Sequence, residues 1–185
     1  MVVGLLGLQG AFRDHVPHLQ RCAVRHCIVR DAPTLAAIDR LIIPGGESTV
    51  MFKFLKAYRM LSPLKARIAG GMPVWGICAG AIVLAQRIDH RPGVIGALEI
   101  AVTRNAYGRQ LASSLKKLCL PTLGATDFPA IFIRAPRIDG CGSDVQVHAR
   151  CGEDPVFVQS GRVMATTFHP ELTEDDRFHR YFLNL

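Results

Sequence analysis

The chain is organised around residues 73–81, which read PVWGICAGA. Residues 74–77 form a short apolar run of strand type, Cys78 follows at once, and residues 81–85 read as the start of a helix. A strand, a sharp turn that carries a nucleophile and a helix make up a nucleophile elbow. Gly76 and Gly80 flank the cysteine, because a Cβ atom would clash where the chain passes close to itself. The stretch predicts a nucleophilic Cys78 at the positive end of a helix dipole, the alternative being a buried structural cysteine.

Strands and helices alternate in the first half of the chain. We expect strands at residues 2–8, 26–29 and 40–43 and helices at 12–21, 35–38, 50–58 and 61–69. Ser48 or Thr49 is expected to cap the helix at 50–58. Alternation of this kind indicates a parallel sheet that is covered by helices on both faces.

The pattern changes beyond residue 87. Residues 113–124 read as mostly irregular, and Thr173 is expected to cap a last helix at 174–183. Strands are expected at residues 97–103 and 131–133, and three more follow at hairpin-like spacing at 145–149, 156–159 and 163–167. We therefore predict one α/β domain over residues 1–185, with a three-layer, mostly parallel central sheet flanked by helices and an antiparallel portion in the second half.

Composition narrows the class of protein. The chain has 185 residues, 49% of them hydrophobic and 20% charged, which is typical of a globular domain with a core. Its six cysteines form no C-x-x-C pair, and the first charge is Arg13, so we expect reduced thiols in a cytoplasmic protein without a signal peptide. Residues 68–86 carry no charge, but glycines and a proline break them up, so we expect no membrane span.

The net charge of +7 raises the question of nucleic-acid binding. Lysines and arginines are dispersed along the chain without a long basic run, so a solvated surface, or a face that docks an acidic protein partner, is the better interpretation. His15 and His18 lie three residues apart on a predicted helix, a spacing that a metal could use. Without an evident third ligand we interpret them as polar helix positions near the surface and expect no metal.

A cysteine nucleophile needs a base, since only a few per cent of a thiol with a pKa of ~8.5 is ionised near neutrality. His169 closes a predicted strand and Glu171 lies two residues on, so both point to the same side of an extended segment. Pro170 between them restricts His169 to extended geometry. Glu171 could then hold the imidazole in one tautomer, as the third member of a triad does. Alone, His169 could be a surface histidine and Glu171 a helix-start carboxylate.

An oxyanion hole needs two N–H donors that point at one oxygen. The backbone N–H of Ala79 is one candidate, and Gly46, in the Gly45-Gly46 pair after the third strand, is the other. Two glycines let a peptide plane turn inward at low steric cost, although a plain Pro-Gly turn is the alternative. The G-x-x-x-x-G-K-[ST] pattern of a phosphate-binding loop is absent.

These residues resemble the class I glutamine amidotransferases, in the segments PVWGICAG at 73–80 and FHPEL at 168–172. Further segments are similar to one family among them, the glutaminase subunits of pyridoxal 5′-phosphate synthase. They are GLQGAFR at 7–13, LIIPGGEST at 41–49, RN at 104–105 with GRQ at 108–110, and FIRAP at 132–136. The resemblance covers nearly the whole chain, with Ile77 and Tyr107 as modest departures, and implies a flavodoxin-like fold.

The resemblance implies that Cys78, His169 and Glu171 form the catalytic triad and that Gly46 and Ala79 form the oxyanion hole. It also implies that L-glutamine is the substrate and binds at Gly46, Glu47, Ser48, Arg104, Ile133 and Arg134. A guanidinium is the natural partner of the glutamine α-carboxylate. Without the resemblance, Arg104 and Arg134 would read as surface arginines.

The resemblance further implies a hetero-oligomeric complex with a synthase subunit that uses the ammonia to build pyridoxal 5′-phosphate, and no cofactor in this chain. Two alternatives stay open. One is a different enzyme on the same scaffold, either a glutaminase that feeds another synthase or a cysteine hydrolase or peptidase. The other is a binding or regulatory module that kept the fold without the activity.

Overall fold

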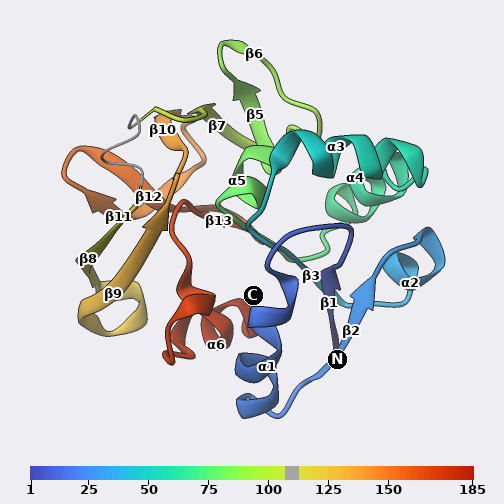
Figure 1. Ribbon diagram of the computed structural model, residues 1–185, viewed down its shortest axis with the longest axis horizontal. Coiled ribbons are helices and arrows are strands. Elements are labelled where there is room, and N and C mark those ends of the chain that lie inside the picture. The colour runs from blue at the N-terminus through green and yellow to red at the C-terminus, as the bar shows by residue number, and fades with distance from the viewer. Residues whose placement is uncertain (107–112) are drawn as a thin grey trace.

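The computed structural model describes residues 1–106 and 113–185 (Figure 1). Within them, seven strands form a central sheet in the order β11-β12-β13-β4-β3-β1-β2. Its strands are β1 (Val2–Leu6), β2 (Arg25–Val29), β3 (Arg40–Ile43), β4 (Val74–Ile77), β11 (Gln146–Cys151), β12 (Asp154–Ser160) and β13 (Val163–Thr166). The five strands from β13 to β2 pair in parallel, whereas β11 and β12 add antiparallel strands at one edge. The predicted α/β fold, with its mostly parallel sheet and its antiparallel portion, is confirmed.

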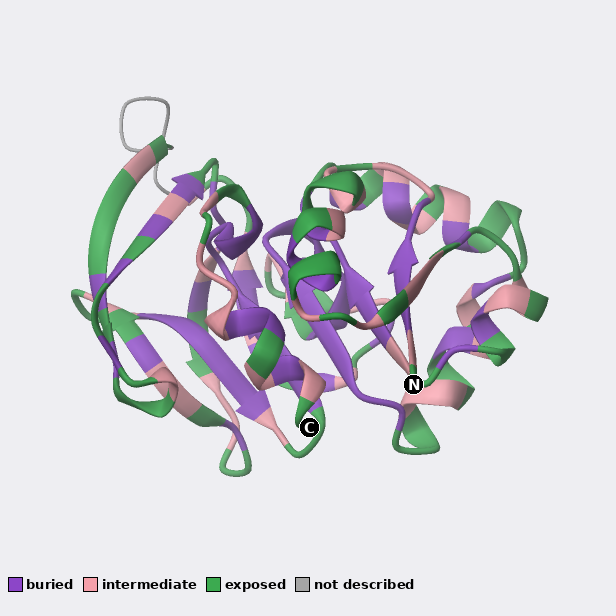
Figure 2. Ribbon diagram, turned by 90° about the horizontal axis from the view of Figure 1, so that it is seen from below, coloured by how far each residue is buried: buried purple, intermediate pink, exposed green. Residues whose placement is uncertain are grey.

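Helices cover both faces of this sheet (Figure 1). On one face lie α2 (Ala32–Ala36), α3 (Ser48–Ala57), α4 (Leu61–Ala69) and α5 (Ala79–Leu84). On the other lie the 3-10 turn η1 (Phe12–His15), α1 (Val16–Arg21) and α6 (Arg177–Leu183). Each layer closes its own hydrophobic core against the sheet, and Figure 2 shows the central strands buried between them. Strands buried on both faces read as continuous apolar runs, which is why β3 and β4 were predictable to the residue.

Two smaller sheets extend the second half of the chain. The first has the order β10-β7-β5-β6 and consists of β5 (Ala85–Ile88), β6 (Arg91–Pro92), β7 (Leu98–Thr103) and β10 (Arg137–Cys141). The second is the antiparallel pair β8 (Ser113–Leu120) and β9 (Ala125–Ile133), joined through the turn η2 (Pro121–Leu123). The prediction that residues 113–124 are mostly irregular is therefore wrong. The sequence does not show the alternation of a strand here, because Lys116 and Lys117 interrupt it and only Leu118 and Leu120 of β8 are buried.

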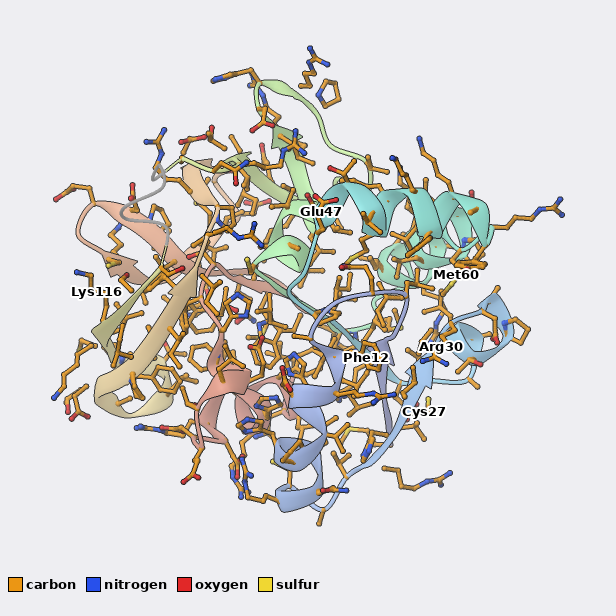
Figure 3. All side chains as sticks on the ribbon, in the orientation of Figure 1. Phe12, Cys27, Arg30, Glu47, Met60 and Lys116 are labelled. Carbon is orange, nitrogen blue, oxygen red and sulfur yellow. The ribbon has the colours of Figure 1, made fainter. Side chains whose placement is uncertain are left out.

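The predicted helix caps are also wrong at two places. Glu47, labelled in Figure 3, caps α3, because its carboxylate accepts hydrogen bonds from the N–H groups of Thr49 at 3.1 Å and Val50 at 2.8 Å. The helix consequently begins at Ser48, two residues earlier than expected. The last helix begins at Arg177 rather than residue 174, because the preceding segment forms the 3-10 turn η3 (Pro170–Leu172) and a tight polar turn in which Thr173 and Asp175 accept backbone N–H groups.

The uncharged stretch at residues 68–86 is divided among four elements, from the end of α4 through β4 and α5 to the start of β5. Across the described ranges 1–106 and 113–185, no helix is both long and apolar enough to cross a membrane.

Candidate active site

The elbow around Cys78 has the geometry that the sequence predicts. Cys78 follows β4 and precedes α5, with φ 50° and ψ −99°, a conformation that L-residues rarely adopt. Its N–H donates to the carbonyl of Thr166 at 2.8 Å, which ties the turn to β13. A Cβ atom at Gly80 would lie 2.1 Å from the carbonyl oxygen of Ile43, and one at Gly76 would lie 2.5 Å from that of Gly80. The two glycines therefore let α5 pack directly on β3 and β4 and hold the strained cysteine in place.

His169 and Glu171 meet Cys78 from the end of β13. The Nδ1–H of His169 donates to Oε1 of Glu171 at 2.7 Å, and the Glu171 side chain is fully buried. Burial lowers the pKa of His169, but hydrogen bonds with Cys78 and Glu171 and their negative charges outweigh it and raise the pKa to about 10. Burial raises the pKa of Glu171, yet the hydrogen bond from His169 and the positive charge of that imidazolium bring it below its usual value. The arrangement favours the imidazolium form of His169 beside an ionised Glu171.

The Gly45-Gly46 loop lies against this pair. A Cβ atom at Gly45 would lie 2.5 Å from Cε1 of His169, so the imidazole packs on the bare backbone of the loop. Gly46 has φ 150°, and a Cβ there would lie 2.4 Å from Oε1 of Gln9. The same Gln9 oxygen accepts the N–H of Glu47 at 3.0 Å. Both glycines are therefore required by close approach, and the loop lies beside His169, where an oxyanion donor would be needed.

A pocket of about 420 Å³ opens above Cys78. It is lined by Gly46, Glu47, Ser48, Cys78, Ala79, Ile82, Arg104, Asn105, Ile133, Arg134 and Pro136. The structure thus brings every predicted substrate-binding residue into one cavity, together with the nucleophile and both predicted oxyanion donors. His169 and Glu171 support the cysteine from behind and do not line the pocket.

The two arginines of the pocket are held differently. Nε of Arg104 donates to Asp89 at 2.7 Å, its backbone N–H donates to the same carboxylate at 2.9 Å, and its NH1 donates to Thr49 at 3.2 Å. Burial raises the pKa of Asp89, but these contacts with Arg104 outweigh it and lower the pKa. Arg134 has φ 44°, which makes the chain turn sharply where β9 ends beside the pocket.

Glu47 has a different role from the one that its place in the pocket suggests. Both of its carboxylate oxygens accept N–H groups of α3, and these bonds outweigh burial and lower its pKa. Its side chain is therefore committed to the helix cap, while its backbone N–H donates to Gln9 and its carbonyl accepts from Met51, so Glu47 holds the shape of the pocket wall.

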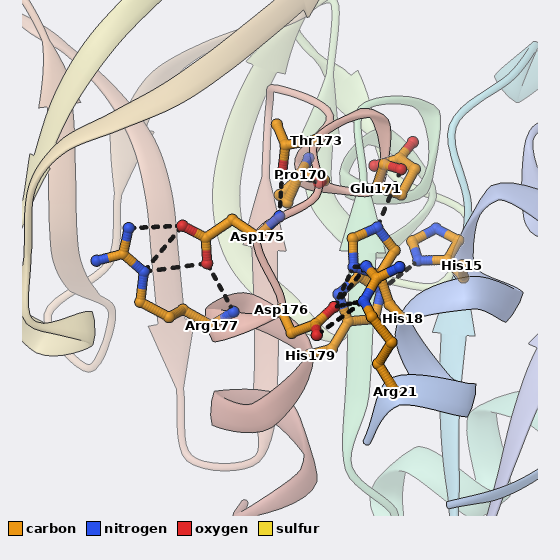
Figure 4. A network of polar contacts seen from close by, with 10 residues as sticks. All are labelled: His15, His18, Arg21, Pro170, Glu171, Thr173, Asp175, Asp176, Arg177 and His179. Carbon is orange, nitrogen blue, oxygen red and sulfur yellow. Dashed lines mark hydrogen bonds and ion pairs between the residues drawn. The ribbon is translucent and has the colours of Figure 1, made fainter. Parts of the chain in front are cut away.

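Several features of the site escaped the sequence analysis. Asp89 and Thr49, which orient Arg104, gave no signal because each becomes a neighbour of that residue only in the folded chain. The prediction that His15 and His18 lie near the surface is wrong, since they are 0% and 2% exposed and pack beside Glu171 with His179 (Figure 4).

Among the described residues no group of three or more histidine, cysteine or acidic side chains could hold a metal ion. All six cysteines are free thiols. Tyr107 and the GRQ segment at 108–110 lie outside the described residues.

Comparison with known proteins agrees with this geometry. Residues 5–185 match the SNO glutamine amidotransferase family. The chain is 47% identical to pyridoxal 5′-phosphate synthase subunit PdxT of Thermotoga maritima, covering 100% of this chain and 99% of the relative. It is 44% identical to the protein of the same name from Kosmotoga olearia, covering 99% of this chain and 96% of the relative.

Solved structures give the same picture. A crystal structure of a glutamine amidotransferase superposes with a TM-score of 0.92 at 44% identity, covering 100% of this chain and 98% of that one. A chain in the structure of PurLQS from Thermotoga maritima has a TM-score of 0.71 at 17% identity, covering 99% of this chain and 97% of that one, which shows a shared fold.

Proposed function

The chain belongs to the SNO glutamine amidotransferase family, and from that premise we propose that it is the glutaminase subunit of a pyridoxal 5′-phosphate synthase. It hydrolyses L-glutamine to L-glutamate and ammonia. The observation that carries the proposal is a strained elbow cysteine that interacts electrostatically with His169, whose imidazole is hydrogen-bonded to the buried Glu171, at a pocket with two arginines. Near-full coverage of the PdxT relatives supports the choice of this glutaminase over one that feeds another synthase.

The reaction is acyl transfer to Cys78 and then to water. The thiolate attacks the side-chain amide carbon of glutamine, and the tetrahedral oxyanion is held by the N–H groups of Gly46 and Ala79. The imidazolium of His169 gives its proton to the departing nitrogen, which leaves as ammonia. His169 then takes a proton from water as the water attacks the thioester, and glutamate is released. Glu171 keeps the imidazole in one tautomer and stabilises its cation.

Glutamine recognition follows from the walls of the pocket. Arg104 is exposed on the pocket side while Asp89 and Thr49 hold its orientation, so it suits the α-carboxylate of glutamine. Arg134, Ile133 and the backbone of residues 46–48 complete the walls. An amino acid with both a carboxylate and an ammonium group fits such a polar pocket better than the interior of a peptide would, which disfavours a peptidase.

The chemistry of ammonia explains why this glutaminase needs a synthase partner. Ammonia takes up a proton readily in water, and ammonium is not a nucleophile, so the glutaminase works in a hetero-oligomeric complex with the synthase subunit. We expect low activity alone and higher activity in the complex, because the peptide between Gly45 and Gly46 can turn its N–H into or out of the oxyanion hole. The free cysteines fit a reducing, cytoplasmic setting.

Cys78→Ala tests the proposal. We expect the variant to release no ammonia from glutamine while it keeps its fold and its binding to the synthase subunit. Cys119→Ala is the matched control, because that thiol is exposed, lies outside the pocket and should leave turnover unchanged. Full activity of Cys78→Ala would remove Cys78 from the mechanism.

Equal ammonia release from glutamine with and without the synthase subunit would contradict activation in the complex. Release from glutaminyl peptides at the rate seen with free glutamine would favour a peptidase instead.

A further inference from the structure

Three buried histidines lie beneath the triad acid, and the reaction described above uses none of them (Figure 4). His15 comes from η1, His18 from α1 and His179 from α6, so the cluster joins the two ends of the chain. The rings of His18 and His179 stack at 4.1 Å. His15 and His179 pack edge-on against Trp75 of β4, the strand that leads to Cys78, at 5.7 and 5.1 Å. The cluster therefore packs against the strand of the nucleophile on one side and Glu171 on the other.

His18 holds the backbone of the acid. Its Nε2–H donates to the carbonyl of Glu171 at 3.1 Å, and its Nδ1 lies 2.7 Å from Asp176. Arg21 also donates to Asp176, at 2.7 Å, so the support continues to the surface. His18 therefore supports the backbone of Glu171, and these contacts do not involve the Glu171 carboxylate.

The Glu171 carboxylate is only half satisfied. Oε1 accepts from His169, but Oε2 is buried, and within the described part of the chain no hydrogen bond reaches it. A buried carboxylate oxygen without a donor is costly, so a neighbouring dipole or charge is expected to compensate. His15 is the neighbour in question: its Nε2 is also buried without a hydrogen bond, and the two side chains interact electrostatically. Figure 4 shows its ring below and to the right of the acid, next to the ring of His18.

The protonation of His15 decides what it presents to Glu171. Burial lowers the pKa of His15 to about 4, against the raising effect of Glu171, so the ring is neutral near pH 7 and carries one N–H. Its Nδ1 lies 2.9 Å from Nε2 of His179, and one proton is shared along that contact. If His179 donates it, the proton of His15 is on Nε2 and its N–H dipole points toward the carboxylate. The opposite tautomer would point a lone pair at an anion.

We propose that His15 is a positioning residue for Glu171. Held as the Nε2–H tautomer by His179, it presents its N–H dipole to the free side of the carboxylate and keeps that carboxylate anionic and directed at His169. This inference rests on the proposed triad mechanism. It extends that mechanism by one residue, which acts through Glu171 and does not touch the substrate.

The tautomer can be measured in the unaltered protein. Two-bond ¹H–¹⁵N correlation spectra of the ¹⁵N-labelled chain at pH 7 distinguish Nε2–H from Nδ1–H, and His15→Gln identifies the signals of His15. We expect Nε2–H at His15. A neutral ring protonated on Nδ1 would overturn the proposal whether or not any variant folds.

Two polar substitutions test the effect on catalysis. Gln places an amide nitrogen near the position of Nε2, whereas the shorter Asn places it near Nδ1, so both are neutral and only Gln keeps a donor toward Glu171. We expect His15→Asn to lower kcat about 10- to 100-fold, the usual cost of losing a supporting partner, with KM for glutamine unchanged. His15→Gln should stay within about 3-fold of the wild-type kcat.

His148→Gln is the control, because His148 is a half-buried histidine on β11 that contacts Thr122 away from the triad. Equal kcat values for the Gln and Asn variants of His15 would overturn the inference. So would a loss in the Asn variant that appears in KM alone. If Cys78→Ala keeps full activity, the proposed function itself is refuted. If Cys78→Ala is inactive but the two His15 variants have equal kcat values, only the role proposed for His15 is refuted.

Discussion

Replacing Glu171 by Gln removes the charge of the triad acid and keeps its shape. The rise of the His169 pKa from 6.5 to about 10 corresponds to about 5 kcal/mol of preferential stabilisation of the imidazolium ion. Cys78 and Glu171 share that stabilisation, and an amide retains an acceptor for Nδ1–H without the charge. Loss of about half of it, roughly 2 to 3 kcal/mol, lowers the rate on the order of 10²-fold.

The assay is ammonia release at saturating glutamine in the presence of the synthase subunit. Glu174→Gln is the matched control, because that carboxylate is exposed three residues further along and should leave kcat unchanged. We expect kcat of Glu171→Gln to fall and KM to stay within about 2-fold, since the acid does not line the pocket. A variant as fast as the wild type would refute the reasoning that the buried acid sustains the imidazolium.

Glu171→Gln also changes the pH dependence of stability. Because the pKa of His169 is raised on folding, its contribution to the free energy of unfolding is complete below pH 6.5 and is lost as pH rises to about 10. Denaturant unfolding of the wild type should therefore show stability falling by a few kcal/mol between pH 7 and pH 10, and the slope should be shallower in Glu171→Gln. Parallel slopes in the two proteins would show that Glu171 does not supply the stabilisation.

Two further substitutions follow from the same geometry. Asp89→Ala frees the Arg104 side chain, so KM for glutamine should rise about 3- to 10-fold with kcat nearly unchanged. Asp144→Ala, at an exposed position, is the control and should change neither constant. A loss confined to kcat in Asp89→Ala would contradict a role in substrate binding. Gly80→Ala would place a Cβ atom 2.1 Å from the carbonyl oxygen of Ile43. The free energy of unfolding, measured in denaturant titrations, should therefore fall by about 3 kcal/mol or more. A variant of wild-type stability would show that α5 can move off β3.

Local sequence was enough to predict the elbow and the pairing of His169 with Glu171. The glycines around Cys78 restrict the backbone within a few residues. His169 and Glu171 meet as expected, but through the 3-10 turn at Pro170–Leu172, so the expectation of an extended segment there is wrong. Continuous apolar runs likewise predicted the central strands. What these segments have in common is that their geometry is specified by neighbours along the chain.

Features that depend on contacts distant in sequence were not predictable in this way. The short strands β5, β6 and β10 are defined by their pairing with β7 or with one another, and β8 is mostly exposed, so none carries a clear hydrophobic period. Asp89 is 15 residues from Arg104, and His179 is 164 residues from His15. Nothing near His15 along the chain indicates that another histidine will cover it, so a surface position was the natural expectation for a polar residue.

The histidine cluster has a consequence for how the fold supports catalysis. Glu171 lies in a single 3-10 turn, which by itself fixes a side chain poorly. Its backbone is held by His18 from the first helical segment, and His179 from the last helix reaches it through His15. Trp75, on the strand of the nucleophile, packs on the same rings and donates its indole N–H to Thr166 of β13, the strand that leads to His169. The two ends of the chain and the strands that lead to Cys78 and His169 therefore meet in one buried cluster beside Glu171.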